Sequence, residues 1–409
     1  MVVALLFIGS VINYIDRAVL GVVMPQLRKD LSLSNADYGL AVNAFLVLYM
    51  IFYILGGRVA DRWGYRRTFT VTVTFWSIAS MLQGLAQGLG SLCFFRALLG
   101  IGEGAYYPTA IRGVSEWFTP ENRAKAVGVL LCGVSVGSLL TPPIVAWITL
   151  HFGWRASFVL TGAAGFLLVL LWSYLYRTIR RTLGNVDETA PERTRLGSET
   201  IEEEQIPLKE VLKQRKYWFL LMARATTDAA WLFYIFWIPG YFQVIRGYDL
   251  VKVGRWLWIP FFFADIGALA GAWASSALIR RGFGLDPSRK IVLIASAILG
   301  LFGIGTYYIP SHSLAITFIS VALFGHFSWA SNIHTVITEV IPKRHVAVLY
   351  GITGAAGTGL GVVAQYFTGR LVDIAGYEVP FVGASIAYLL AIALLLLAGK
   401  IEPIRAKPI

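Results

Sequence analysis

Charge is scarce in this sequence. Only 14% of its 409 residues are charged and 57% are hydrophobic, whereas about a quarter of a typical soluble domain is charged. Cysteine is scarcer still, since Cys93 and Cys132 are the only two and both lie in apolar runs. They are interpreted as small buried residues, which excludes a disulfide framework and a cysteine metal site. The composition favours a protein embedded in a lipid bilayer.

Alternation of apolar and polar residues is also missing, which excludes a membrane β-barrel. The apolar runs are continuous and reach the roughly 20 residues that cross a bilayer as a helix. We therefore predict an all-α membrane protein with twelve transmembrane helices. The predicted spans are 2–24, 36–57, 68–87, 91–112, 123–149, 154–177, 216–244, 253–279, 290–309, 312–340, 345–371 and 379–400.

One link between spans is long and polar. Residues 178–215 are rich in charge, include three consecutive glutamates and are poor in aromatics, which is typical of a solvated linker. This linker separates an N-terminal six-helix bundle, 1–177, from a C-terminal six-helix bundle, 216–409. A weak repeat with a spacing of 223 residues supports two related halves. It pairs Gly128, Gly153 and Phe158 with Gly351, Gly376 and Phe381.

The net charge of +12 follows a topological pattern. Of the 35 Lys and Arg residues, we place 24 on one set of links, 7 on the opposite set and 4 within spans. Because cytoplasmic links carry the excess of positive charge, both termini and the long linker are predicted to be cytoplasmic. The positive charge then needs no nucleic-acid partner.

Ionisable groups inside the predicted spans need an explanation, since each costs at least about 2.5–3.5 kcal/mol at the bilayer centre. Span 1 holds Tyr14, Asp16 and Arg17. Arginine grips a carboxylate with two parallel hydrogen bonds and stays charged. We predict that Arg17 anchors an anionic ligand, with Tyr14 on its face, and that Asp16 carries a proton. The alternative is a static Asp–Arg pair that fixes this helix to a neighbour.

Span 4 holds Arg96 and Glu103 on one helical face, about 10 Å apart along the axis. That separation leaves room for a third group, either a water or Asp16. We predict that Glu103 is a second proton carrier and that Arg96 tunes its protonation, with structural pairing as the alternative. Tyr49, in the middle of span 2, is predicted to contact the ligand. The alternative is that its ring only packs against neighbouring helices.

The second half carries fewer charges within its spans. Arg224 and Asp228, one helical turn apart, are interpreted as a structural pair. Aromatic rings stack on the apolar faces of sugars, and hydroxyl and amide groups can bind their hydroxyls. The candidate ligand contacts are Trp231, Tyr234, His326, Trp329, Ser331 and Asn332. Helix packing is the alternative for the aromatics, and His326 fits a proton relay and a core residue equally well.

The link after span 2, residues 56–67, reads Gly-Gly-Arg-Val-Ala-Asp-Arg-Trp-Gly-Tyr-Arg-Arg. It resembles the cytoplasmic signature of the major facilitator superfamily. Glycines such as Gly57 allow close helix approach, and Asp61 can pair with an arginine or a helix terminus. We predict a conformational latch, or gate, that includes Arg62 and Arg66. The alternative is simple topological charge.

Three further motifs together resemble the anion:cation symporter family. They are Asn-Tyr-x-Asp-Arg at 13–17, Arg-Ala-Leu-Leu-Gly-Ile-Gly-Glu at 96–103, and Glu-Trp-Phe-x-Pro-x-x-Arg at 116–123. Runs at 227–239, 264–267 and 328–332 are most similar to bacterial hexuronate transporters. The resemblance implies two halves that alternate access and a proton-coupled uptake of a sugar acid. It matches Asp16 and Glu103 to the protonatable pair.

We therefore expect a symporter for a hexuronate such as glucuronate or galacturonate, multi-pass in a bacterial cytoplasmic (inner) membrane. An aldonate, an aldarate or an aromatic acid is the alternative substrate, and a non-transporting membrane sensor is the alternative class. We expect a monomer whose partners are the sugar acid, protons and the lipid bilayer. No enzyme is expected, because the sequence shows no nucleophile–base set; neither a cofactor nor a metal is expected.

Overall fold

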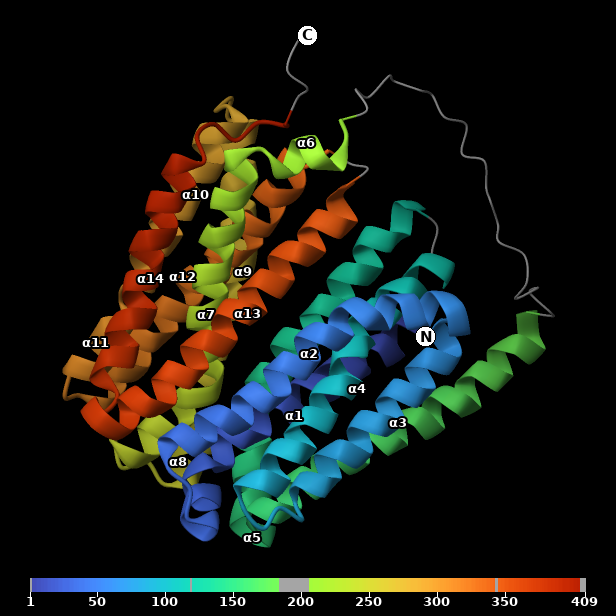
Figure 1. Cartoon of the computed structure of the whole chain (residues 1–409), viewed down its shortest axis with the longest axis vertical. Helices are drawn as coiled ribbons and strands as arrows, with labels where there is room; N and C mark the ends of the chain where they lie inside the picture. The colour runs from blue at the N-terminus through green and yellow to red at the C-terminus, as the bar shows by residue number, and fades with distance from the viewer. Residues whose placement is uncertain (1, 118–119, 184–205, 343–344, 405–409) are drawn as a thin grey trace.

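The computed structural model describes residues 2–117, 120–183, 206–342 and 345–404, and within these ranges the regular elements are helices, with no strand (Figure 1). The predicted all-α fold is confirmed. The helices are α1 (Val2–Leu31), α2 (Asn35–Trp63), α3 (Tyr65–Gln83), α4 (Leu89–Trp117), α5 (Pro120–Leu183), α6 (Leu208–Leu212), α7 (Arg215–Val244), α8 (Leu250–Trp256), α9 (Trp258–Arg280), α10 (Leu285–Gly300), α11 (Gly303–Tyr308), α12 (His312–Val340), α13 (Val346–Ala375) and α14 (Glu378–Leu397).

These helices follow the predicted spans with three differences. The fifth and sixth spans both lie in α5, as two helices that meet at a kink at Gly153, where φ is 81° and ψ is 166°. The eighth span consists of α8 and α9, and the ninth of α10 and α11. In the described ranges, nine helical stretches are long and apolar enough to cross a membrane. The longest of them lies in α5 and covers most of the fifth and sixth predicted spans. The third and fourth predicted spans correspond to α3 and α4, which are more polar and are not among the nine.

The sequence repeat is visible in the backbone. Gly153 and Gly376 both adopt a positive φ, 81° and 71°, in the left-handed region that glycine enters without steric cost. Five residues after each glycine, Phe158 and Phe381 are both fully buried. The two halves therefore make the same turn before their last span.

Figure 1 shows two bundles, α1–α5 and α6–α14. The predicted linker between them, 178–215, has residues 184–205 outside the described ranges; α5 continues to Leu183 and α6 lies before α7. Inside the first bundle, α4 packs closely on α2. A Cβ added at Gly104 would lie 2.6 Å from the carbonyl oxygen of Tyr49, so only glycine permits this approach. The close packing brings Tyr49 beside the charged residues of α4.

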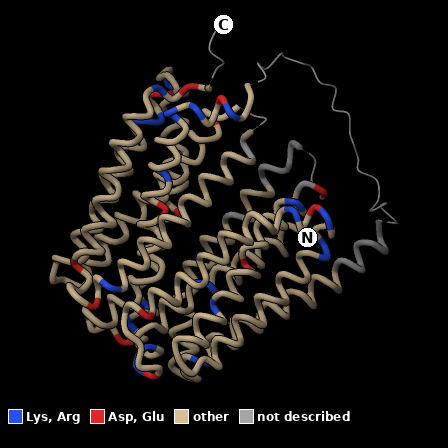
Figure 2. Tube along the Cα trace, viewed as in Figure 1, with Lys and Arg blue, Asp and Glu red and all other residues tan. Residues whose placement is uncertain are grey.

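The two bundles meet at one end, where α1 contacts α7, α2 contacts α13, and α5 contacts α8 and α9. Tyr38 Oη donates to the carbonyl of Phe236 at 2.7 Å, and Gln243 Nε2 donates to the carbonyl of Val22 at 2.8 Å. Toward the other end the helices of the two bundles diverge (Figure 1). Figure 2 shows that most charged residues gather near the helix ends, with a few at mid-depth. Those few define the candidate site.

Candidate functional site

Arg17 and Glu103 form the central ion pair of the first bundle. Arg17, halfway along α1, donates from Nε and Nη2 to one oxygen of Glu103, Oε2, at 3.1 and 3.0 Å. Nη2 also donates to Oδ1 of Asn13 at 3.3 Å. The second glutamate oxygen, Oε1, is buried and has no hydrogen-bond partner among the described residues. The partner of Glu103 is therefore Arg17 on α1, and not Arg96 on its own helix.

Three aromatic rings surround the Arg17 guanidinium. Its central carbon lies 4.7 Å from the ring centre of Tyr14, 4.5 Å from that of Tyr49 and 5.3 Å from that of Phe45. A ring face attracts a cation through its quadrupole, more strongly when water is excluded. The structure thus brings together Tyr14, Arg17 and Tyr49, as the sequence predicts. Their role in binding a ligand stays a prediction.

Arg96 is a buried cation that lies against aromatic rings. It has no exposed surface, and none of its three guanidinium nitrogens donates to another group among the described residues. Its guanidinium lies over the ring of Phe45, at 4.5 Å, and 5.9 Å from the ring of Phe236 on α7 of the other bundle. Burying an unpaired charge is costly. An anion at this position, where the bundles meet, would remove that cost.

Asp16 points away from Arg17, toward α3. Its Oδ1 accepts from Ser80 Oγ at 2.9 Å, while Oδ2 is buried without a partner in the described ranges. Adjacent residues on a helix are about 100° apart, so Asp16 and Arg17 face different neighbours. The predicted static Asp–Arg pair is absent here. The first bundle therefore contains two buried carboxyl groups, one paired with arginine and one that accepts from the hydroxyl of Ser80.

The signature link forms a tight corner between α2 and α3. Gly64 alone separates them, with φ at 77°. Asp61, whose side chain is 70% exposed, pairs with Arg112 of its own bundle at 3.8 Å, and Arg112 also pairs with Glu116 at 2.9 Å. An added Cβ at Gly57 would lie 3.8 Å from Pro108 of α4.

Two other residues of the predicted gate lie at the same corner. Arg62 is exposed in the last turn of α2, and Arg66 is partly buried in the first turn of α3. The gating role of these residues, as of Gly57 and Asp61, stays a prediction.

In the second bundle, Trp231 stacks on His326. Their ring centres are 5.6 Å apart and their planes are 9° from parallel. The Nδ1 atom of His326 lies 2.9 Å from the hydroxyl of Tyr388, inside the same bundle. Trp231 is partly exposed, whereas His326 is buried. Of the two, Trp231 is the better placed to contact a ligand.

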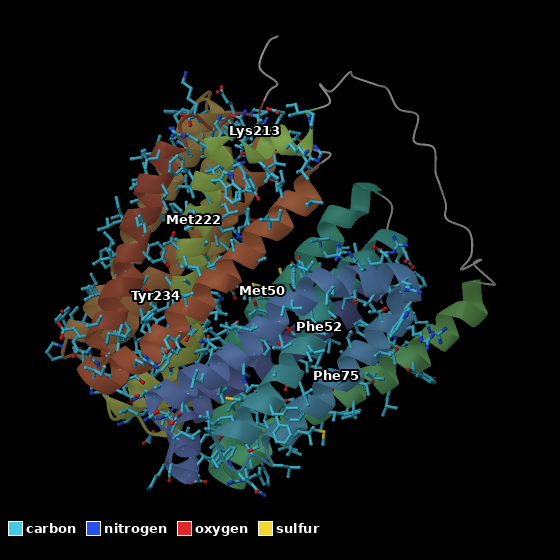
Figure 3. All side chains as sticks on the ribbon, in the orientation of Figure 1. Met50, Phe52, Phe75, Lys213, Met222 and Tyr234 are labelled. Atoms are coloured by element: carbon cyan, nitrogen blue, oxygen red, sulfur yellow. The ribbon has the colours of Figure 1, made fainter. Side chains whose placement is uncertain are left out.

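The remaining predicted contacts include Tyr234 of the second bundle (Figure 3) and are mostly less accessible. Tyr234, Trp329 and Asn332 have no exposed surface. Asn332 Nδ2 donates to the carbonyl of Ser328 at 3.0 Å, and its Oδ1 accepts from Arg289 at 3.3 Å. Ser331, partly exposed, donates to the same carbonyl at 3.0 Å. In this conformation Tyr234, Trp329 and Asn332 belong to the interior of the second bundle. A ligand role for these three residues and for Ser331 stays a prediction.

The predicted Arg224–Asp228 pair is present on α7, at 3.2 Å. Arg224 also donates to Thr353 Oγ1 of α13 at 2.6 Å and lies over the ring of Tyr350 at 4.7 Å. Because Arg224, Asp228 and Trp231 are four and three residues apart, they share one face of α7. The charge of Arg224 is therefore compensated, unlike that of Arg96.

Sequence reasoning missed two polar clusters. Arg289, counted as a topological charge, pairs with Glu339 at 2.6 Å and donates to Ser275 at 2.7 Å. Asp373 of α13 accepts from the start of α2 in the other bundle, through the backbone N–H groups of Asn35 and Ala36. Neither residue lies in a motif, so no sequence signal could have found its partner. The described ranges contain no group of three or more His, Cys, Asp or Glu side chains that could hold a metal ion.

Two bundles of membrane-spanning helices, with unpaired charge buried where they meet, define a transporter and not an enzyme. The profile of the Major Facilitator Superfamily matches residues 6–364. The chain belongs to that superfamily, and it is a multi-pass membrane protein.

Curated relatives cover nearly the whole chain. It is 30% identical to a hexuronate transporter of Bacillus subtilis (strain 168), over 100% of this chain and 96% of that protein. It is 29% identical to a D-galactonate transporter of Escherichia coli O6:H1, over 98% and 96%. It is 26% identical to a probable galactarate/D-glucarate transporter of Escherichia coli K12, over 98% and 95%.

Solved structures share the fold at lower identity. A bacterial homologue of the human lysosomal transporter Spinster, in an inward-facing and occupied conformation, has a TM-score of 0.74 and 19% identity, covering 97% of this chain and 94% of that one. The xylose transporter XylE from E. coli, in an inward open conformation, has a TM-score of 0.71 and 16% identity, covering 96% and 94%. These likenesses support the architecture alone.

Proposed function

We propose that this protein is a proton-coupled symporter that imports a sugar acid, a hexuronate such as glucuronate or galacturonate, across the bacterial cytoplasmic membrane. The observation that carries the proposal is the buried, unpaired guanidinium of Arg96, beside an Arg17 that is enclosed by aromatic rings. The names of the relatives, which are transporters of hexuronates, galactonate and galactarate, support an organic anion as the substrate.

Charge balance supports the proton. The first bundle buries Arg17, Arg96, Glu103 and Asp16, and the charges of these four groups sum to zero when both carboxyl groups are ionised. A bound carboxylate adds one negative charge in a region where uncompensated charge costs several kcal/mol. Protonation of either carboxyl group restores neutrality. One proton per carboxylate is therefore the stoichiometry that we expect.

The Arg17–Glu103 pair suggests how binding of the proton and of the substrate could be coupled. While Glu103 is ionised, it occupies Nε and Nη2 of Arg17, the two donors that a substrate carboxylate would need. When Glu103 is protonated, the pair weakens and Arg17 becomes available. Substrate and proton would then bind together, which is the requirement of symport.

The meeting of the bundles at one end supports alternating access. That end contains the α1–α2 and α7–α8 links, which the positive-inside rule assigns to the outside. The structure would then be closed to the outside, with the substrate released toward the cytoplasm. We propose that Asp61 and its neighbours latch the opposite state, in which the cytoplasmic ends approach each other.

The test is transport by the purified protein in liposomes. Galacturonate counterflow should be measurable without a proton gradient, and an inward proton gradient should drive accumulation. A sensor without transport would show neither. Counterflow without any response to the proton gradient would contradict proton coupling but would still support transport of the sugar acid.

A second candidate substrate is an aldonate, favoured by the 29% identity to a D-galactonate transporter over nearly the whole chain. Its single carboxylate would meet the same arginines. Competition of galactonate and galacturonate in the same counterflow assay decides between them. If galactonate competes at tenfold lower concentration, the aldonate is the substrate.

A further inference from the structure

A groove on the second bundle carries an inference that is independent of the transported substrate. It lies between α9 and α10, has a volume of about 370 Å³ and is floored by α12. Both α9 and α10 pack mainly on α12 and have fewer contacts with each other, so the groove between them stays open. The lining side chains are almost all apolar, and the exposed rings and chains at its rim include Trp273 and Ile291.

Small residues of α9 make the groove deep. Ala270, Ala274 and Ala277 line it on one helical face. At its floor, Ser296 and Ser328 hydrogen-bond to each other at 2.6 Å, so their hydroxyl groups are satisfied. Such a surface offers a ligand apolar contact and no polar partner along its length.

One charged residue stands at the end of the groove. Arg281, directly after α9, lines it and is exposed, and no described carboxylate forms an ion pair with it. Two cations of α10 nearby are already compensated, Arg289 by Glu339 and Lys290 by Asp286. Arg281 is therefore the groove cation that is available to an external anion.

The length of the groove matches one leaflet. Ala270 and Arg281 are eleven residues apart, which is about 16 Å along a helix. Half of the roughly 30 Å hydrocarbon core of a bilayer is about 15 Å. A ligand that reaches from the headgroup level to the bilayer centre would fill the groove, with its polar end at Arg281.

We propose that this groove binds an anionic phospholipid, with one acyl chain between α9 and α10 and the phosphate paired with Arg281. Arginine binds phosphate with two parallel hydrogen bonds, and basic pockets between membrane helices at the cytoplasmic side suit anionic headgroups. A zwitterionic lipid can fill the apolar part but its ammonium group offsets the attraction of Arg281. The groove should therefore select lipids by headgroup charge.

The test uses Trp273, at the rim, as an optical reporter. The full-length protein is placed in nanodiscs of phosphatidylcholine that contain a small fraction of brominated phosphatidylglycerol or of brominated phosphatidylcholine. The signal of Trp273 is the difference between the protein and its Trp273→Phe variant. We expect brominated phosphatidylglycerol to quench this signal at least threefold more than brominated phosphatidylcholine at equal fraction. Equal quenching by the two lipids would overturn the proposal.

Two variants separate charge from shape. Arg281→Gln should abolish the preference for phosphatidylglycerol, whereas Arg280→Gln, the adjacent exposed arginine that does not line the groove, should keep it. Ala274→Phe should fill the groove and reduce quenching by both lipids. If Arg280→Gln loses the preference as fully as Arg281→Gln, general surface charge is responsible and the groove is not the site. Displacement by millimolar inorganic phosphate would equally contradict a lipid.

Discussion

Arg17 directs two donors, Nε and Nη2, at a single oxygen of Glu103, at 3.1 and 3.0 Å, and the other oxygen has no hydrogen-bond partner in the part of the chain that the structure describes. A bidentate pair would use both oxygens. A competing carboxylate could therefore take the place of Glu103 on Arg17. This exchange would not require the two bundles to separate, because α1 and α4 belong to the same bundle. This relationship makes the exchange between Glu103 and a substrate testable.

The first prediction concerns coupling. Glu103→Gln removes the charge that competes for Arg17, so galacturonate counterflow should remain while accumulation driven by a proton gradient falls at least tenfold. Asp16→Asn should also lose accumulation, since it removes the second buried carboxyl group. The control is Glu210→Gln on α6, whose carboxylate pairs at the surface with Lys213. If both buried variants accumulate substrate with the normal pH dependence, the assignment of the proton carriers is wrong.

The second prediction concerns the anchor. Arg17→Ala removes a buried charge partner, an effect of about 2–4 kcal/mol, which corresponds to roughly 30- to 1,000-fold weaker binding. Thermal shift of the purified protein with added galacturonate measures the binding. Lys213→Ala, at the surface, should bind normally. Retained affinity in Arg17→Ala would show that Arg17 is not the anchor.

The sequence pattern of a helix predicts which residues share a face, but it does not predict which neighbouring helix that face contacts. The spans follow from composition, and Tyr14 with Arg17 follows from helical spacing. The partner of Arg17 does not, because it depends on how α1 and α4 are rotated about their axes. Asp16 faces α3 for the same reason.

The burial of individual side chains in the second bundle could not be predicted from the sequence either. Tyr234 and Asn332 are fully enclosed, yet their positions read like those of cavity-lining residues. Lipid-facing and core-facing helix surfaces are both apolar in a membrane protein, so amphipathicity does not separate the two.

The third prediction concerns the contact that closes one end. Asp373 accepts from the N–H groups of Asn35 and Ala36 at 3.0 and 2.8 Å, and from the side chain of Asn35 at 2.7 Å. A carboxylate at a helix N-terminus is stabilised by the helix dipole and by charge-assisted hydrogen bonds. Asp373→Asn removes that charge and should favour the state open at this end by about 1–2 kcal/mol, a 5- to 30-fold shift.

Spin labels measure this shift. One label replaces Lys29 and the other Lys252, exposed residues near the same end in the two bundles, in a background with both native cysteines replaced by serine. The population with the longer distance should increase in Asp373→Asn. Glu378→Gln, which removes a charge whose oxygen accepts from Tyr308 within the second bundle, should leave the distances unchanged. An unchanged distance distribution in Asp373→Asn would show that Asp373 does not stabilise the closed end.

The fourth prediction concerns selectivity, and it rests on the proposed sugar-acid substrate. Arg224 is held by Asp228 at 3.2 Å and by Thr353 at 2.6 Å, so its charge is already neutralised. A second carboxylate placed against this part of α7 would meet Asp228 and an arginine that is already paired. The second bundle should therefore favour the uncharged end of a monoacid, because placing like charges together in a weakly screened site is unfavourable.

Asp228→Asn should release Arg224 and raise the affinity for galactarate relative to galacturonate by about tenfold, which is 1.4 kcal/mol. Competition of the two acids against labelled galacturonate in counterflow gives the ratio directly. Thr353→Val is the matched control, since it removes a hydrogen bond to Arg224 but leaves the charge balanced, and its ratio should match that of the unmodified protein. A ratio unchanged in Asp228→Asn would mean that Arg224 does not face the bound substrate, and the pair would then have a purely structural role within α7.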